Sequence, residues 1–136
     1  MPFITKQFKF CAAHKYWNDT WDKDQNYKVF GDDIKVHGHN YVLDITITGP
    51  INKDSGFIFC IQELKGIVRK NIIKPLDHSQ IQVDIPWFHG KQPSTENLCL
   101  FIWQSLVPHI VKPAYLYKIK LRETPTIFTE YYGPEK

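Results

Sequence analysis

Three histidines of this chain have the residue type and the spacing of a metal site. His37 and His39 flank a single glycine at the start of an alternating run, and His14 ends an earlier run of the same kind. Successive side chains of a β-strand point to opposite faces, so His37 and His39 share one face. Gly38 keeps the backbone between them uncrowded. Three neutral imidazoles leave a tetrahedral zinc ion with one open position, which is typical of a catalytic zinc site.

The faces that carry these histidines continue into the expected core. Four apolar side chains follow in the parity of His37 and His39, namely Tyr41, Leu43, Ile45 and Ile47. Three more share the parity of His14 along the earlier run, namely Phe8, Phe10 and Ala12. We therefore expect pairing of the two strands to bring the three imidazoles together. The open alternative is a metal-free rim, in which the imidazoles are polar strand-end residues hydrogen-bonded to the sheet.

The other elements follow from apolar periodicity and turn residues. The expected order is strands at 4–13 and 39–48, helices at 61–75 and 94–108, and strands at 115–124 and 127–132. Pro75 ends the first helix, and Ser94 or Thr95 caps the second. The connection between the first two strands and the stretch 76–90 are expected to be irregular. Two helices on one face of a four-stranded antiparallel sheet form an α+β layer, whose open face favours assembly with further copies.

Length, composition and charge limit the class of protein. At 136 residues with 43% hydrophobic content, the chain is expected to form one domain over residues 1–136. Its 17 Lys and Arg and 14 Asp and Glu are interspersed, which does not favour nucleic-acid binding. No apolar run reaches the ~20 residues of a membrane helix. Three cysteines without a Cys-x-x-Cys pair, and no secretory segment, indicate a reducing cytoplasm.

Five ordered motifs resemble one known family over nearly the whole chain. They are Phe10-Cys-Ala-Ala-His14, His37-Gly-His-Asn-Tyr41, Leu76-Asp-His78, Ser94-Thr-Glu-Asn97 and Glu123-Thr124. Together they resemble the 6-pyruvoyltetrahydropterin synthase and 6-carboxytetrahydropterin synthase family. Three further segments are most similar to the 6-pyruvoyltetrahydropterin synthase branch, namely Lys74-Pro-Leu-Asp-His78, Phe101-Ile-Trp103 and Leu116-Tyr-Lys118.

The resemblance implies a fold, an assembly and a metal. The implied fold is the tunnelling fold, in which subunits join their sheets into trimeric barrels. Two trimers then stack into a homo-hexamer with active sites between subunits. The implied metal is Zn2+, bound by His14, His37 and His39, with oxygens of the substrate side chain at the open position. These are the same histidines that strand parity places on shared faces.

The resemblance also implies roles for polar residues outside the metal site. By resemblance, Glu123 is both a catalytic residue of the proton relay and the anchor of a pterin, whose 2-amino and ring N–H groups are two parallel donors of the kind that a carboxylate accepts. Asp77 and His78 act as an acid–base pair, and Thr95 and Glu96 line the pterin pocket. Without the resemblance, Glu123 would form a strand-end salt bridge. Asp77 and His78 would then be a surface pair in a turn, and Thr95 and Glu96 only the start of a helix.

One departure from the family concerns its thiol base. Relatives carry a cysteine shortly before the His-Gly-His motif, but the segment Phe30-Gly-Asp-Asp-Ile-Lys-Val-His37 has none. Asp33, or its neighbour Asp32, lies near the expected position of that thiol. A carboxyl has an unperturbed pKa of about 4, against about 8.5 for a thiol, so it is a weaker base for carbon-bound protons. Cys11 is no substitute, since its strand parity opposes that of His14. The alternative is that both acids are solvated loop charges.

The resemblance and the residues together predict a zinc-dependent pterin lyase. Its expected substrate is 7,8-dihydroneopterin triphosphate, which loses triphosphate to give 6-pyruvoyltetrahydropterin. Lys35, Lys74 or Lys91 could meet the triphosphate, and nothing in the sequence selects among them. One enzyme alternative is formation of 6-carboxytetrahydropterin for deazaguanine synthesis. The other is cleavage to 6-hydroxymethyl-dihydropterin for folate, because some relatives that release this product are similar in carrying an acidic residue near the position of Asp33. The non-enzyme alternative is a pterin- or zinc-binding protein without turnover.

Overall fold

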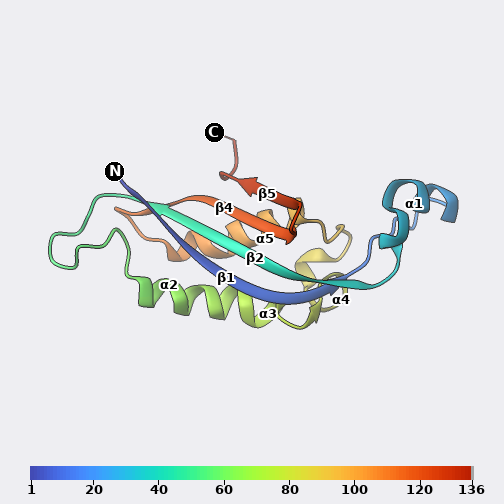
Figure 1. The fold of residues 1–136 in the computed structure, drawn as a ribbon, viewed down its shortest axis with the longest axis horizontal. Helices are drawn as coiled ribbons and strands as arrows, with labels where there is room; N and C mark the ends of the chain where they lie inside the picture. Colours follow the sequence, from blue (N-terminus) through green and yellow to red (C-terminus); the bar gives the residue numbers. More distant parts are fainter. Residues whose placement is uncertain (136) are drawn as a thin grey trace.

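The computed structural model describes residues 1–135 and contains one curved sheet with helices along one face (Figure 1). The sheet has the strand order β3-β1-β2-β4-β5. Its strands are β1 (Phe3–His14), β2 (His37–Thr48), β3 (Ser79–Gln80), β4 (Tyr115–Thr124) and β5 (Ile127–Tyr131). The α-helices are α1 (Lys23–Phe30), α2 (Ile61–Val68), α3 (Lys74–Leu76), α4 (Ile81–Asp84) and α5 (Thr95–Leu106). The α+β class expected from the sequence is confirmed.

Alternation along β1 and β2 determines which side chains enter the core. The two strands pair antiparallel over their whole lengths, and His14 lies opposite His37. Leu43, Ile45 and Ile47 of β2 are fully buried on the face that the helices cover. Each such side chain contributes about 1.5–3 kcal/mol when it leaves water. A slip of one residue would turn this whole set outward, so burial of the apolar face also fixes the position of the histidines.

The helices α2 and α5 supply the other half of the core. They lie along the same side of the sheet (Figure 1), and their fully buried residues include Leu64, Val68, Leu98, Ile102 and Leu106. A π-helical segment at 69–73 joins α2 to α3, so the helix expected at 61–75 continues to Leu76. Ser94 is the residue that caps α5, since its hydroxyl accepts from the Asn97 backbone N–H.

The expectation of irregular structure is wrong in two places. The connection between β1 and β2 contains α1, which the Asp22 side chain caps. The one buried side chain of this helix, Asn26, is polar and donates hydrogen bonds to backbone oxygens. The helix is therefore held by hydrogen bonds and not by an apolar face, so its sequence shows no apolar periodicity. The stretch 76–90 contains β3 and α4, so the sheet has five strands and not four. The two residues of β3 pair in parallel with Ala12 and Ala13 of β1.

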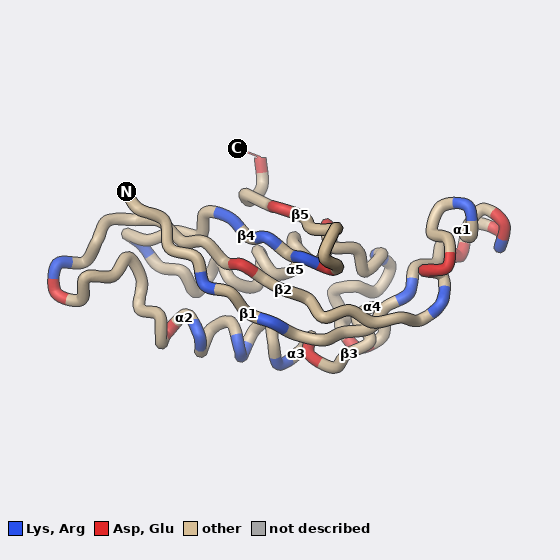
Figure 2. Tube along the Cα trace, in the orientation of Figure 1, with Lys and Arg blue, Asp and Glu red and all other residues tan. Residues whose placement is uncertain are grey.

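Charged residues are spread along the strands β1, β2, β4 and β5 of the sheet (Figure 2). Lys118, Lys120 and Arg122 occupy alternate positions of β4 and therefore share a face. The ammonium of Lys118 lies 3.0 Å from a carboxylate oxygen of Glu130 on β5, and both Lys120 and Arg122 lie over the ring of Phe128. Among the described residues, no helix has both the length and the apolar content that a membrane span requires.

Candidate metal centre and active site

The side-chain nitrogens of three histidines converge at the end of the β1–β2 pair. Nε2 of His14 lies 3.0 Å from Nε2 of His37 and 3.1 Å from Nε2 of His39. The cross-strand pairing of His14 with His37 and the two-residue period of β2 bring the rings together. His14 is fully buried, and the side chains of His37 and His39 are mostly buried. With Glu123 they form a group that could hold a metal ion.

Backbone carbonyls determine which nitrogens of this cluster carry protons. Nδ1 of His14 lies 2.9 Å from the carbonyl oxygen of Pro93, and Nδ1 of His37 lies 2.8 Å from that of Lys35. A carbonyl only accepts, so each Nδ1 must donate, and each neutral ring then has its lone pair on Nε2. Two lone pairs that face each other at 3.0 Å repel unless a proton or a metal ion lies between them. Carbonyl partners at the far nitrogen are usual for metal-binding histidines.

The spacing of the cluster fits a small tetrahedral ion. Zn–N bonds of about 2.0–2.1 Å would separate two tetrahedral ligands by about 3.3 Å. The Nε2 atoms of His14 and His37 would therefore move apart by only ~0.3 Å. Neutral imidazole is also a ligand type that zinc prefers. The donor set and the distances are therefore both compatible with the zinc site expected from the sequence.

Glu123 ends its alternating strand directly beside the histidines. Its Oε1 lies 2.7 Å from Nε2 of His39 and 3.4 Å from Nε2 of His14. The adjacent His14 lowers the pKa of Glu123, against the opposing effect of burial, whereas burial lowers the pKa of His39. These directions favour an ionised carboxylate beside a neutral imidazole. Both contacts fall on Oε1, which leaves Oε2 of Glu123 for another hydrogen-bond donor.

Asp33 is the acid that the fold brings to the cluster. It lies in a 3-10 turn over Gly31–Ile34, and its Oδ1 is 3.5 Å from Nε2 of His37. The backbone N–H of Tyr16 donates to the carbonyl of Asp33 and ties this turn to the segment after β1. Asp32 is exposed and forms no ion pair among the described residues. Of the two acids that the sequence left open, Asp33 is the one that lies beside the histidine cluster.

The Asp77–His78 pair lies on the other side of β1. Oδ2 of Asp77 is 2.9 Å from Nδ1 of His78, and Oδ1 accepts from the backbone N–H of Cys11 at 2.8 Å. That backbone hydrogen bond is the main cause that lowers the pKa of Asp77. The backbone of His78 is in the left-handed region, with φ of 63°, and its side chain is 81% exposed. Within the described chain, neither residue forms a hydrogen bond or an ion pair with the histidine cluster.

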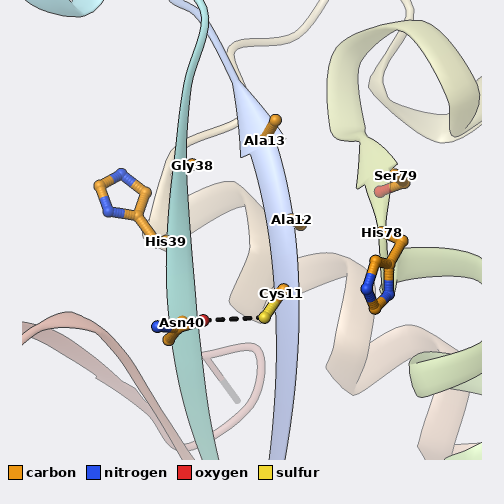
Figure 3. A pocket seen from close by; sticks show the side chains of 8 residues that line it. All are labelled: Cys11, Ala12, Ala13, Gly38, His39, Asn40, His78 and Ser79. Atoms are coloured by element: carbon orange, nitrogen blue, oxygen red, sulfur yellow. Dashed lines mark hydrogen bonds between the residues drawn. The ribbon is translucent and has the colours of Figure 1, made fainter.

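A cavity of about 370 Å³ is lined by residues of β1 and β2 and by His78. His78 and His39 both line it, but Figure 3 shows His78 on the outer side of β1 and the His39 ring on the outer side of β2. The thiol of Cys11 lies between them and donates to Oδ1 of Asn40 at 2.8 Å. The Asp77–His78 pair and the histidine cluster of one chain are therefore on different sides of the β1–β2 ribbon.

The whole chain matches proteins of one family. The sequence profile of the 6-pyruvoyl tetrahydropterin synthase family matches residues 3–134. The chain belongs to this family. The 6-pyruvoyl tetrahydrobiopterin synthases of Drosophila melanogaster and Dictyostelium discoideum are each 36% identical to it, over 136 and 130 residues. These alignments cover 98% and 96% of this chain, and 81% and 95% of those proteins. The structure of Caenorhabditis elegans 6-pyruvoyl tetrahydropterin synthase gives a TM-score of 0.88 at 27% identity and covers 98% of each chain. The expected tunnelling fold is confirmed.

The start of α5 approaches the metal centre of this 6-pyruvoyl tetrahydropterin synthase family member. Thr95 is buried, and its hydroxyl donates to Oε1 of Glu96 at 2.9 Å and lies 2.8 Å from the hydroxyl of Thr129 on β5. Burial raises the pKa of Tyr16, and the charges of Glu123 and Glu96 both raise it further. The charges of Glu96 and Glu123 thus act on the same tyrosine from two elements. That Thr95 and Glu96 line a pterin pocket stays a prediction.

Three residues at the centre were not predicted from the sequence. The Tyr16 ring lies 4.9 Å from the His14 ring, and the hydroxyl of Tyr41 lies 3.3 Å from Nδ1 of His14. Parity was the available signal for both tyrosines, since Tyr16 follows His14 by two residues and Tyr41 lies on the predicted core face. Pro93 contributes only its carbonyl, and no residue type reveals a role of that kind.

Proposed function

We propose that this chain is a zinc-dependent pterin lyase that converts 7,8-dihydroneopterin triphosphate to 6-pyruvoyltetrahydropterin and triphosphate. The observation that supports it best is the pair of facing Nε2 atoms of His14 and His37, each with its Nδ1 proton held by a carbonyl. That arrangement favours a cation with room for a further oxygen ligand. The reaction needs no external oxidant, because oxidation of the side-chain carbons is balanced by reduction of the dihydropterin ring.

The residues of the site divide the chemistry among them. Bound zinc supplies polarisation of the substrate side-chain oxygens, which acidifies the neighbouring C–H groups. Glu123 accepts the 2-amino and ring N–H donors of the pterin, and its lowered pKa keeps it ionised for this. Asp33 takes a side-chain proton in place of the missing thiol, and its position 3.5 Å from Nε2 of His37 supports this role. Asp77 orients His78 as the second proton-transfer group.

The position of His78 supports an assembly of several copies. Its exposed ring lies across β1 from the cluster of its own chain. We therefore assign to each metal centre the Asp77–His78 pair of a neighbouring copy, in a homo-hexamer of two stacked trimers. Each copy contributes the single domain of residues 1–136. The three cysteines are all free, which fits a reducing cytoplasm as the location.

A specific observation favours a second group of products. A relative from Haemophilus influenzae, 30% identical over 149 residues, is named 6-carboxy-5,6,7,8-tetrahydropterin synthase. This chain also has Asp33 near the position where the thiol is expected. The alternative products are therefore 6-carboxytetrahydropterin and 6-hydroxymethyl-dihydropterin. Both would need the same metal and the same pterin contact at Glu123, so only the product distinguishes these activities from the main proposal.

The test is mass-spectrometric product analysis with zinc-loaded protein and 7,8-dihydroneopterin triphosphate. We expect a pyruvoyl product from the wild type and none from a no-enzyme control. Asp33→Asn should lower the rate by about 10²–10⁴-fold, the usual contribution of a general base. Asp32→Asn is the matched control, since it removes the adjacent charge and should leave the rate unchanged. Unchanged substrate with the wild type would reject the lyase proposal, and equal losses in both variants would reject the role of Asp33.

A further inference from the structure

A second cavity adjoins the metal centre on the β4 side. It has a volume of about 730 Å³, and its lining includes His39 and Glu123 of the cluster together with Arg122 and Thr124. It lies where β4 stops pairing with β2, the last paired residues being Val42 and Arg122. Because the ladder ends there, side chains from both faces of the sheet reach this cavity. A molecule bound at Glu123 can therefore extend toward Arg122.

Arg122 is fixed in place but not neutralised. Its Nη1 donates to the carbonyl of Pro125 at 2.8 Å, and its guanidinium carbon lies 4.6 Å from the centre of the Phe128 ring. The carbonyl uses one of the five N–H donors of the guanidinium, and the aromatic face restricts its plane. Among the described residues, no ion pair involves Arg122. The remaining donors can meet an anionic ligand without breaking an existing salt bridge.

We infer that Arg122 binds the triphosphate tail of the substrate. The inference rests on the proposed function, in which Glu123 holds the pterin ring and the side chain reaches the metal. A guanidinium presents paired N–H groups that match phosphate oxygens. Arg122 carries the one Lys or Arg side chain among the residues lining this cavity. None of the lysines considered from the sequence, Lys35, Lys74 and Lys91, lines it.

The direct test uses inorganic triphosphate as the probe, titrated by calorimetry into the wild type, Arg122→Gln and Lys120→Gln. Lys120 is the matched control: it lies on the same face of β4, and its ammonium is 4.3 Å from the Phe128 ring centre, but it does not line the cavity. We expect Arg122→Gln to bind triphosphate about 10- to 100-fold more weakly. Lys120→Gln should stay within about threefold of the wild type. Equal weakening in both variants, or none in Arg122→Gln, overturns the inference.

Two further measurements separate this inference from the proposed function. Unphosphorylated 7,8-dihydroneopterin should bind the wild type and Arg122→Gln equally, because it has no tail to contact Arg122. If it binds neither protein, the pterin site is wrong, while the triphosphate titration still decides the role of Arg122. Arg122→Lys keeps the positive charge but lacks the paired N–H groups of the guanidinium, so its affinity for triphosphate should lie between those of the wild type and Arg122→Gln. This second variant keeps the inference testable if Arg122→Gln fails to fold. Triphosphate chelates zinc, so the proteins are compared at equal metal content before and after titration.

Discussion

The histidine cluster and the Asp77–His78 pair both depend on β1, but the chain holds them in different ways. His14 is fully buried, has a carbonyl at Nδ1 and meets two other rings at Nε2. His78 has an 81% exposed side chain, and among the described residues its ring forms an ion pair with Asp77 alone. One chain therefore forms the histidine cluster by itself but leaves the ring of His78 exposed. Under the proposed function, metal binding would be a property of the folded subunit, whereas turnover would need the assembly.

The largest effect is expected where the chain is most tightly fixed. His14→Ala removes the ring that both other Nε2 atoms face, so stoichiometric zinc binding and product formation should be lost. Metal analysis after zinc reconstitution measures this directly. His89→Ala, which removes an exposed histidine outside the cluster, should retain wild-type zinc. A His14→Ala protein with full zinc content would show that the metal site has been placed wrongly.

A smaller but still large effect is expected at the open pair. His78→Ala should lower the rate of product formation by about 10²–10⁴-fold and leave the zinc content unchanged. Subunits with His78→Ala mixed with subunits carrying His14→Ala should regain part of the activity. In such a mixture, one intact cluster can meet one intact Asp77–His78 pair from another copy. A mixture as inactive as its components would mean that each site is formed within one chain.

A moderate, pH-dependent effect is expected for Asp77. Its pKa is lowered below the ordinary value of 3.8, mainly by the Cys11 backbone N–H, so the carboxylate stabilises the folded state above that pH. The stabilisation relative to Asp77→Asn should shrink as the pH falls through the lowered pKa. Urea unfolding of both proteins from about pH 6 to pH 2.5 tests this. A stability difference that grows on acidification would contradict it.

The smallest effect is expected between the metal ligands. A Cβ added at Gly38 would lie 3.4 Å from the carbonyl oxygen of Ala12, which is an ordinary contact. Gly38→Ala should therefore change the free energy of unfolding by less than about 1 kcal/mol and preserve zinc binding. Thermal unfolding with and without zinc provides the measurement. Loss of the metal in this variant would restore the expectation that the site needs an uncrowded backbone there.

The grouping of the histidines could be predicted because strand parity and apolar burial determine it together. The period of two places His37 and His39 on the face of Leu43, and antiparallel pairing places His14 opposite His37. The helices over 61–75 and 94–108 were also visible in apolar spacing. Each of these features depends on residue type repeated at a fixed interval.

The parts that could not be predicted depend on backbone contacts or on single polar side chains. The helix α1 is stabilised by the hydrogen bonds of Asn26 and by the Asp22 cap, so it has no apolar stripe. The strand β3 consists of two residues that pair through their backbone. The choice of Asp33 over Asp32 follows from the turn that carries both acids. The role proposed for Arg122 depends on the point at which the β2–β4 ladder ends.

The carbonyl of Pro93 connects the metal centre to the helical layer. It accepts the Nδ1 proton of His14 across 79 positions of sequence, and the next residue, Ser94, caps α5 by accepting from the Asn97 amide. A cation at Nε2 makes the Nδ1–H of His14 a stronger donor and so holds this segment more firmly. Amide hydrogen exchange at Asn97 should therefore slow when zinc binds. The rate of amide hydrogen exchange in the first turn of α5 would then report whether the metal site is occupied.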